Sequence, residues 1–225
     1  MGYLFFILPA LLISMYAQYK VKSTFTKYSQ VRSAYGRTGA DVAANLLRLN
    51  GLGNKVGIEP IRGELTDNYD PRSQVLHLSE SVYGNNSIAA IGVAAHEVGH
   101  AIQHNQQYAP MQLRHAIVPV ANFASAASFP ILLVGMLINS LNLILFGVIL
   151  FSAVVLFHVV TLPVEFNASN RAVLQLSQAG LISNEEVPLV KKVLGAAAMT
   201  YLAATLMAIA NLLYYVMIFM GGRDE

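Results

Sequence analysis

The sequence predicts an α-helical membrane protein with about four transmembrane helices and a small α+β unit. Only 12% of its 225 residues are charged and 55% are hydrophobic, whereas roughly 25% charged residues is usual for a soluble domain. Four long apolar segments come close to the about 20 residues that a helix needs to cross a bilayer. They cover residues 3–19, 116–138, 143–162 and 196–220.

These apolar segments divide the chain into five consecutive parts of one domain. We expect the first part to be a retained transmembrane anchor, because no basic residue precedes its apolar run and no convincing cleavage site follows it. The parts are an anchor at 1–19, a polar segment at 20–115, a transmembrane hairpin at 116–162, a second polar segment at 163–195 and a transmembrane helix at 196–220.

Basic residues after the first apolar segment set the predicted orientation. Residues 20–37 hold five of the fourteen Lys and Arg residues and no acidic residue, so the positive-inside rule places this segment in the cytoplasm. The hairpin then returns the chain to the same side. The sequence therefore predicts a multi-pass membrane protein whose two polar segments face the cytoplasm, with the C-terminal GGRDE outside.

The first polar segment reads as a folded unit. Thr38 and Asp41 form a capping-box pattern that opens a helix over 38–49. The runs KVGIEPI and QVLHLS are typical of strands, and the turn-rich DNYDPRS separates them. Ser87 is a candidate N-cap for a further helix over 88–104.

This last predicted helix carries the pattern HEVGH. Its histidines, His96 and His100, lie one helical turn apart and project from one face, close enough to share one metal ion. Glu97 then lies beside the ion, where it can accept a proton from an attacking water. The chain has no cysteine, so histidine and carboxylate must hold any metal, and zinc fits that set. The simpler alternative is a helix with two hydrogen-bonded core histidines.

A catalytic zinc site needs one more protein ligand, and Glu165 is the best candidate. Glu185 and Glu186 stand at a helix start, where acids normally serve the helix dipole. Glu165 follows an apolar span, and a carboxylate there is costly without a cationic partner. Two predicted spans separate it from His100, so both residues emerge on one side. We also expect a new helix to begin at Pro163. Glu165 would then lie in the first turn of this helix, so the alternative is that it only caps the helix and binds no metal.

Arg171 lies near Glu165 on the same predicted helix. It could pair with Glu97, Asp67 or Asp70, or stabilise the oxyanion that develops on a substrate carbonyl. A solvated surface arginine explains the sequence equally well.

The strand QVLHLS precedes the HEVGH helix and is predicted to be a sheet edge that binds an extended peptide by strand addition. Its central His77 could help to hold an oxyanion, although a half-exposed strand histidine without a role is the simpler alternative. The residues of this predicted substrate strand are Val75, Leu76, His77 and Leu78.

The segment LTDNYDPRSQVLHLSESVYGNNSIAAIGVAAHEVGHAIQH, with the later LPVEFNASNRA, resembles the YugP-like group of bacterial membrane-embedded neutral zinc metallopeptidases. The apolar segments match in order, so the resemblance covers nearly the whole chain. It implies a zincin-like, gluzincin-type catalytic unit in the bacterial cytoplasmic membrane. It also implies His96 and His100 as Zn²⁺ ligands, Glu97 as general base and Glu165 as third ligand. Some gluzincin-type peptidases carry an acid where this chain has Asn167.

The sequence thus favours a membrane-bound zinc metalloendopeptidase with its site at the cytoplasmic face. We expect peptide or protein substrates, membrane proteins among them, a lipid bilayer around the apolar segments and no nucleic-acid partner. A non-catalytic zinc-binding scaffold or chaperone-like membrane protein is the alternative, but such a site needs no base at Glu97. An intramembrane protease is disfavoured, because no second acidic ligand motif lies within an apolar span.

Overall fold

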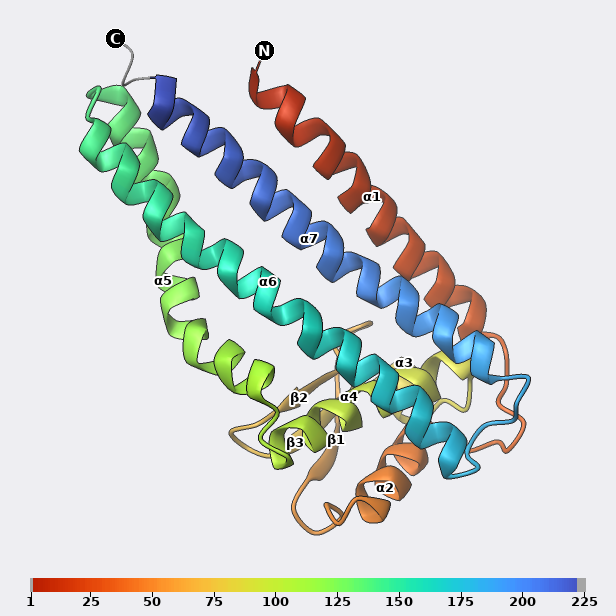
Figure 1. Cartoon of the computed structure of the whole chain (residues 1–225). Helices are drawn as coiled ribbons and strands as arrows, with labels where there is room; N and C mark the ends of the chain where they lie inside the picture. The colour runs from red at the N-terminus through yellow and green to blue at the C-terminus, as the bar shows by residue number, and fades with distance from the viewer. Residues whose placement is uncertain (1, 222–225) are drawn as a thin grey trace. The chain divides into compact units, whose positions relative to one another are not determined.

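The computed structural model describes residues 2–221, with side chains from residue 6 onward. Most of the predicted external GGRDE tail, 222–225, lies outside the described residues. The elements of the described chain follow one another in the order shown in Figure 1. They are α1 (Gly2–Ser29), α2 (Gly39–Leu49), β1 (Gly57–Ile61), β2 (Asn68–Asp70), β3 (Val75–Ser79), α3 (Glu80–Tyr83), α4 (Ile88–Asn105), α5 (Ala109–Leu137), α6 (Leu141–Gln178) and α7 (Val187–Gly221).

The described chain forms two compact units. An apolar unit takes the residues up to 18, 109–163 and those from 200 onward. A mixed unit takes 19–108 and 164–199 and holds the sheet, α2, α3 and α4. The mixed unit covers nearly the same residues as the two polar segments that we expect in the cytoplasm.

Three helices of the described chain are long and apolar enough to cross a membrane: α5, α6 and α7. In the apolar unit, buried Leu132 of α5 and Ile144 and Val148 of α6 form a small core, against which Leu212 and Tyr215 of α7 pack. Large apolar side chains such as Phe123 and Ile149 are exposed, as expected where lipid is the solvent. The chain is therefore a multi-pass membrane protein by length and composition. The fourth span, at 3–19, stays a prediction.

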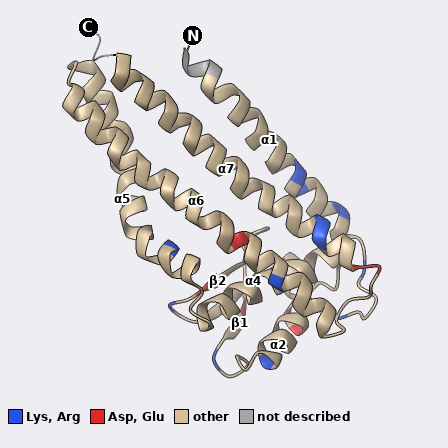
Figure 2. Ribbon diagram, in the orientation of Figure 1, with Lys and Arg blue, Asp and Glu red and all other residues tan. Residues whose placement is uncertain are grey.

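Charge is scarce along these helices. Figure 2 shows long stretches of α5, α6 and α7 without a Lys, Arg, Asp or Glu. The basic residues of α1 and α7 cluster in the parts of these helices that belong to the mixed unit. They are Lys20, Lys22, Lys27, Lys191 and Lys192.

Helix α6 continues through Pro163, so the prediction that Pro163 opens a new helix is wrong. A proline inside a helix removes one backbone hydrogen bond, and the helix bonds before and after it hold the element together. Thr161 donates its hydroxyl to the Phe157 carbonyl in the same turn. Because α6 is unbroken at Pro163, Glu165 lies on the same continuous helix as the apolar residues before Pro163.

The sheet of the mixed unit has the order β1-β3-β2, with β1 parallel and β2 antiparallel to β3. The prediction that β3 is a substrate-binding edge is therefore wrong, because Val75, Leu76 and His77 pair with strands on both sides. Strand β2 lies inside the turn-rich DNYDPRS, and its pairing with β3 makes it a strand. Leu78 pairs with Pro60 of β1.

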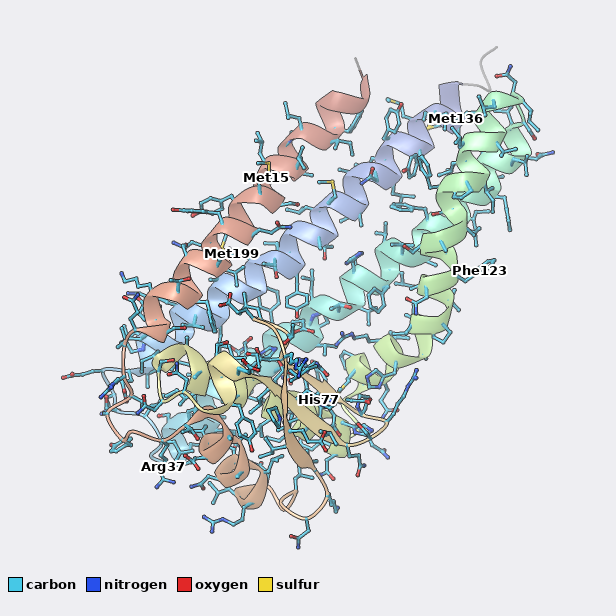
Figure 3. The ribbon with its side chains drawn as sticks, turned by 180° about the vertical axis from the view of Figure 1, so that it is seen from behind. Met15, Arg37, His77, Phe123, Met136 and Met199 are labelled. Atoms are coloured by element: carbon cyan, nitrogen blue, oxygen red, sulfur yellow. The ribbon has the colours of Figure 1, made fainter. Side chains whose placement is uncertain are left out.

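Strand β3 places its leucines in the core of the mixed unit. Leu76 and Leu78 are fully buried in a cluster that includes Ala94 and Val98 of α4. Burying a leucine side chain stabilises the fold by about 1.5–3 kcal/mol. Since side chains alternate along a strand, His77 (labelled in Figure 3) leaves on the face of the sheet opposite Leu76 and Leu78.

Both predicted helix caps are present. The Thr38 hydroxyl accepts from the Asp41 amide, and the Asp41 carboxylate accepts from the Thr38 amide, which completes the capping box of α2. The Ser87 hydroxyl accepts from the Ala90 amide at the start of α4. Each such cap stabilises a helix by about 1 kcal/mol. The second one fixes where the helix of the HEVGH pattern begins.

Candidate metal centre

Helix α4 presents two histidines from one face. The Nε2 atoms of His96 and His100 lie 3.1 Å apart, and both side chains are buried. The rings meet edge to face, with centroids 4.7 Å apart. Two bare imidazole nitrogens at this distance gain little from each other, so the arrangement favours a cation between them.

Helix α6 adds the third ligand candidate. Glu165 Oε2 lies 3.3 Å from His96 Nε2 and 3.5 Å from His100 Nε2, and its side chain is also buried. The three atoms thus form a triangle with sides of 3.1, 3.3 and 3.5 Å. Ligand atoms about 2.0–2.2 Å from a tetrahedral zinc ion lie about 3.3–3.6 Å apart. The triangle therefore fits one face of a zinc tetrahedron, and the fourth corner is left for a further ligand.

Glu97 is buried next to these three residues. Burial raises the pKa of its carboxyl group, the histidines His100 and His96 counteract this, and the negative charges of Glu165 and Asp67 add to the rise. The pKa of Glu97 therefore lies above its ordinary value. A carboxylate with a raised pKa takes up a proton more readily than an ordinary glutamate, as a general base requires.

Burial also acts on His100, in the opposite direction. It lowers the pKa of the imidazole, but the hydrogen bond to Glu165 and the charges of Glu97 and Glu165 outweigh it, so that the pKa is raised. The carboxylates that favour a proton on His100 would also favour a metal cation bound at the same position.

Each imidazole also has a partner on its Nδ1 atom. The Ser169 hydroxyl oxygen lies 3.1 Å from His96 Nδ1, and the Gln103 carbonyl oxygen lies 3.0 Å from His100 Nδ1. The sequence predicts neither contact, and the predicted site includes neither Ser169 nor Gln103. The place of Gln103 three residues after His100 on the same helix was the one available signal.

Arg171 contacts amide groups and a ring in the described structure. Its Nε donates to Asn167 Oδ1 at 2.6 Å, its Nη1 donates to Gln106 Oε1 at 2.7 Å, and its guanidinium lies 5.9 Å from the Tyr108 ring centroid. These partners differ from Glu97, Asp67 and Asp70, the acids with which the sequence suggested that Arg171 could pair. Arg171 is linked to His100 through Asn167 and Gln103.

The predicted strand residues do not join the metal ligand candidates. His77 lies on the face of the sheet opposite Leu76 and Leu78, which face α4, so the structure does not bring His77 to the group of His96, His100 and Glu165. Asp67 directly precedes β2, and Asp70 is the last residue of β2. Asp67 accepts hydrogen bonds from the Ser79 amide and hydroxyl.

Gly99 allows α4 and α6 to approach closely at this site. A Cβ atom at Gly99 would lie 2.8 Å from the Ala168 carbonyl oxygen and 3.2 Å from the Ala168 Cα. We predict that Gly99→Ala pushes the helices apart, destabilises the protein by about 1–3 kcal/mol through overpacking and weakens metal binding. Thermal unfolding in detergent and a metal titration measure both effects.

Gly92→Ala on the same helix is the matched control. A Cβ atom there would meet only Val190 Cγ1, at an ordinary 3.4 Å. Alanine is also the better helix former by about 1 kcal/mol. Equal melting temperatures and metal affinities for the two variants would contradict the close-approach role of Gly99.

Comparison with known proteins shows the family to which the chain belongs. Residues 3–220 match the family described as "putative neutral zinc metallopeptidase". The chain is also 54% identical over 225 residues to "putative membrane protease YugP" of Bacillus subtilis (strain 168), with 100% of both chains covered. No solved structure matches the chain. The described chain also holds a buried His-His-Glu group that could bind a metal ion. Because the family match extends over nearly the whole chain, the chain belongs to this zinc metallopeptidase family.

Proposed function

We propose that this protein is a membrane-bound zinc metalloendopeptidase in which His96, His100 and Glu165 hold the ion and Glu97 is the general base. The observation that carries the proposal is the triangle of three buried donor atoms, with sides that suit a tetrahedral zinc ion, beside a buried carboxyl group. A zinc ion held by these residues would supply Lewis acidity and would lower the pKa of a water molecule there towards about 7.

Glu97 then moves the proton of the reaction. Its carboxylate takes a proton from the water that attacks the peptide carbonyl and gives that proton to the leaving amine. Helix α4 suits this task because it carries the base and two ligands within five residues, in a buried segment. Burial excludes competing water and strengthens the interaction of the base with charge that develops on the substrate.

Strand addition of a substrate backbone needs a strand with a free edge, and we place the substrate along the outer edge of β2. Strand β2 is an outer strand of the described sheet, and its Tyr69 hydroxyl is hydrogen-bonded to His104 Nδ1 of α4 at 2.8 Å. Asp67, just before β2, is close enough to Glu97 for its charge to raise the pKa of that residue. An extended peptide added to β2 would therefore run near the base.

Removal and return of zinc tests the proposed function. We expect a purified, detergent-solubilised protein to lose cleavage of an unfolded protein substrate after chelation, and to regain it linearly up to one zinc ion per chain. Mg²⁺ should not restore cleavage, because it prefers oxygen ligands in an octahedron. Cleavage that survives complete removal of zinc would contradict the proposal, whereas one bound zinc without cleavage would favour the non-catalytic scaffold.

We also propose that the mixed unit faces the cytoplasm. The basic residues of 20–37 and the even number of spans between the two polar segments support this orientation. Because the chain has no cysteine, single cysteines at exposed Glu64 and at exposed Asn142, at the start of α6, should label with an impermeant reagent from opposite sides of the membrane. Labelling of both from one side would refute the assignment.

A further inference from the structure

We propose that Arg171, Asn167 and Gln103 form a hydrogen-bond relay that sets which nitrogen of His100 carries the proton, so that Nε2 faces the metal with a free lone pair. The three are positioning residues that act through His100. This inference builds on the proposed zinc site, but the protonation state of His100 can be measured without zinc.

Gln103 is the central member of the relay. It is fully buried, and its amide nitrogen donates to the Val164 carbonyl oxygen at 2.8 Å and to Asn167 Oδ1 at 3.0 Å. A backbone carbonyl can only accept a hydrogen bond, so the nitrogen end of the Gln103 amide must face Val164. Its oxygen end consequently faces His100, with Oε1 3.0 Å from Nδ1.

The amide oxygen of Gln103 can only accept as well, so His100 Nδ1 must carry the hydrogen. In the neutral imidazole the other nitrogen then has the free lone pair. That nitrogen, Nε2, is the one that lies 3.1 Å from His96 Nε2 and 3.5 Å from Glu165 Oε2. The relay thus prepares His100 as a ligand before any metal arrives.

Arg171 anchors the other end of the relay. A guanidinium group only donates, so its Nε, 2.6 Å from Asn167, fixes the oxygen of the Asn167 amide at that position. The same Oδ1 atom receives the second hydrogen of Gln103. The bond to Gln106 and the Tyr108 ring hold Arg171 in place. Every hydrogen bond from Arg171 to His100 therefore has only one possible direction.

His96 offers the contrast within the same site. Its Nδ1 atom faces the Ser169 hydroxyl, which can donate or accept. Ser169 accordingly fits either protonation state of His96, and no relay imposes one. Helix α6 supplies Glu165 and, within the next four residues, Asn167 and Ser169, so one helix provides a candidate ligand and supports both histidines.

The relay makes an unusual prediction for Gln103→Glu. A carboxylate that accepts from a ligating histidine ordinarily raises the basicity of that ligand. Here the second carboxylate oxygen would face two acceptors, the Val164 carbonyl and Asn167 Oδ1. We therefore expect Gln103→Glu to bind zinc more weakly than the wild type.

The decisive test compares Asn167→Asp with Asn167→Leu in the full-length protein. Aspartate still accepts from Gln103 and Arg171, whereas leucine has a similar size and accepts from neither. We expect the zinc affinity, measured by competition with a chromogenic chelator, to stay within about threefold for Asn167→Asp and to fall about 10–100-fold for Asn167→Leu. Arg171→Lys and Arg171→Met, which change the other end of the relay, repeat the comparison if Asn167→Leu folds poorly.

A second measurement reads the relay without zinc. ¹⁵N spectra of histidine-labelled, zinc-free protein report which nitrogen carries the hydrogen, once the pH has been raised until the His100 signals show a neutral imidazole, because the pKa of His100 lies above its ordinary value. We expect His100 with the hydrogen on Nδ1 in the wild type and Asn167→Asp, and a mixture in Asn167→Leu. Unchanged spectra and zinc affinity in Asn167→Leu would overturn the relay. Failure of the wild type to bind zinc would instead overturn the proposed function, while the spectra still decide on the relay.

Discussion

Replacing Glu97 with glutamine should reduce the rate of peptide cleavage by about 10²–10⁴-fold, the usual contribution of a general acid–base residue. Glutamine has the same shape as a protonated glutamate but cannot take a proton from the attacking water. Because burial raises the pKa of Glu97, the buried site already tolerates a neutral side chain, and we expect no loss of folding. His96, His100 and Glu165 are untouched, so zinc should remain bound.

The measurement for this variant is kcat on an unfolded protein substrate, with zinc content determined in the same sample. Glu185→Gln is the matched control, because it makes the same chemical change at an exposed glutamate of the mixed unit. The control should cleave like the wild type. Full activity in Glu97→Gln would remove Glu97 from the mechanism, and loss of zinc from it would show that the carboxylate is a ligand.

Replacing Glu165 with glutamine should abolish zinc binding at low zinc concentration, and cleavage with it. The substitution removes the only carboxylate from the buried triangle and leaves two neutral imidazoles to hold a divalent ion. Loss of an outer-shell partner costs about 10–100-fold in metal affinity, and loss of a ligand should exceed that range. Chelator competition measures the affinity, and circular dichroism shows whether the helices persist.

The two variants separate two roles. Glu97→Gln should keep zinc and lose cleavage, whereas Glu165→Gln should lose both, with cleavage partly restored at high zinc concentration. Wild-type zinc affinity in Glu165→Gln would mean that this residue is only a partner of the two histidines in α4.

Local signals predicted the elements that position the candidate site. Ser87 and the apolar run after it predicted the start of α4, and the spacing of His96 and His100 placed them on one face. Glu165 came from connectivity, since two spans return the chain to the same side. The structure brings these three residues together, and their binding of an ion remains a proposal.

The features that the sequence did not predict depend on long-range partners. Strand β2 consists of residues that are typical of turns, and it is a strand because it pairs with β3. The same pairing makes β3 the central strand of the sheet instead of an edge strand. Gln103 takes its partners, Val164 and Asn167, from a helix about 60 positions further along the chain. No local pattern specifies such contacts.

X-ray absorption at the zinc edge of the purified wild-type protein tests the central claim, a catalytic zinc centre in the buried His-His-Glu group, most directly. We predict one zinc per chain in a four-coordinate shell, with two imidazole nitrogens at about 2.0–2.1 Å and the remaining positions filled by oxygen. Absence of zinc, a shell without imidazole, or an unchanged spectrum in Glu165→Gln would contradict the account.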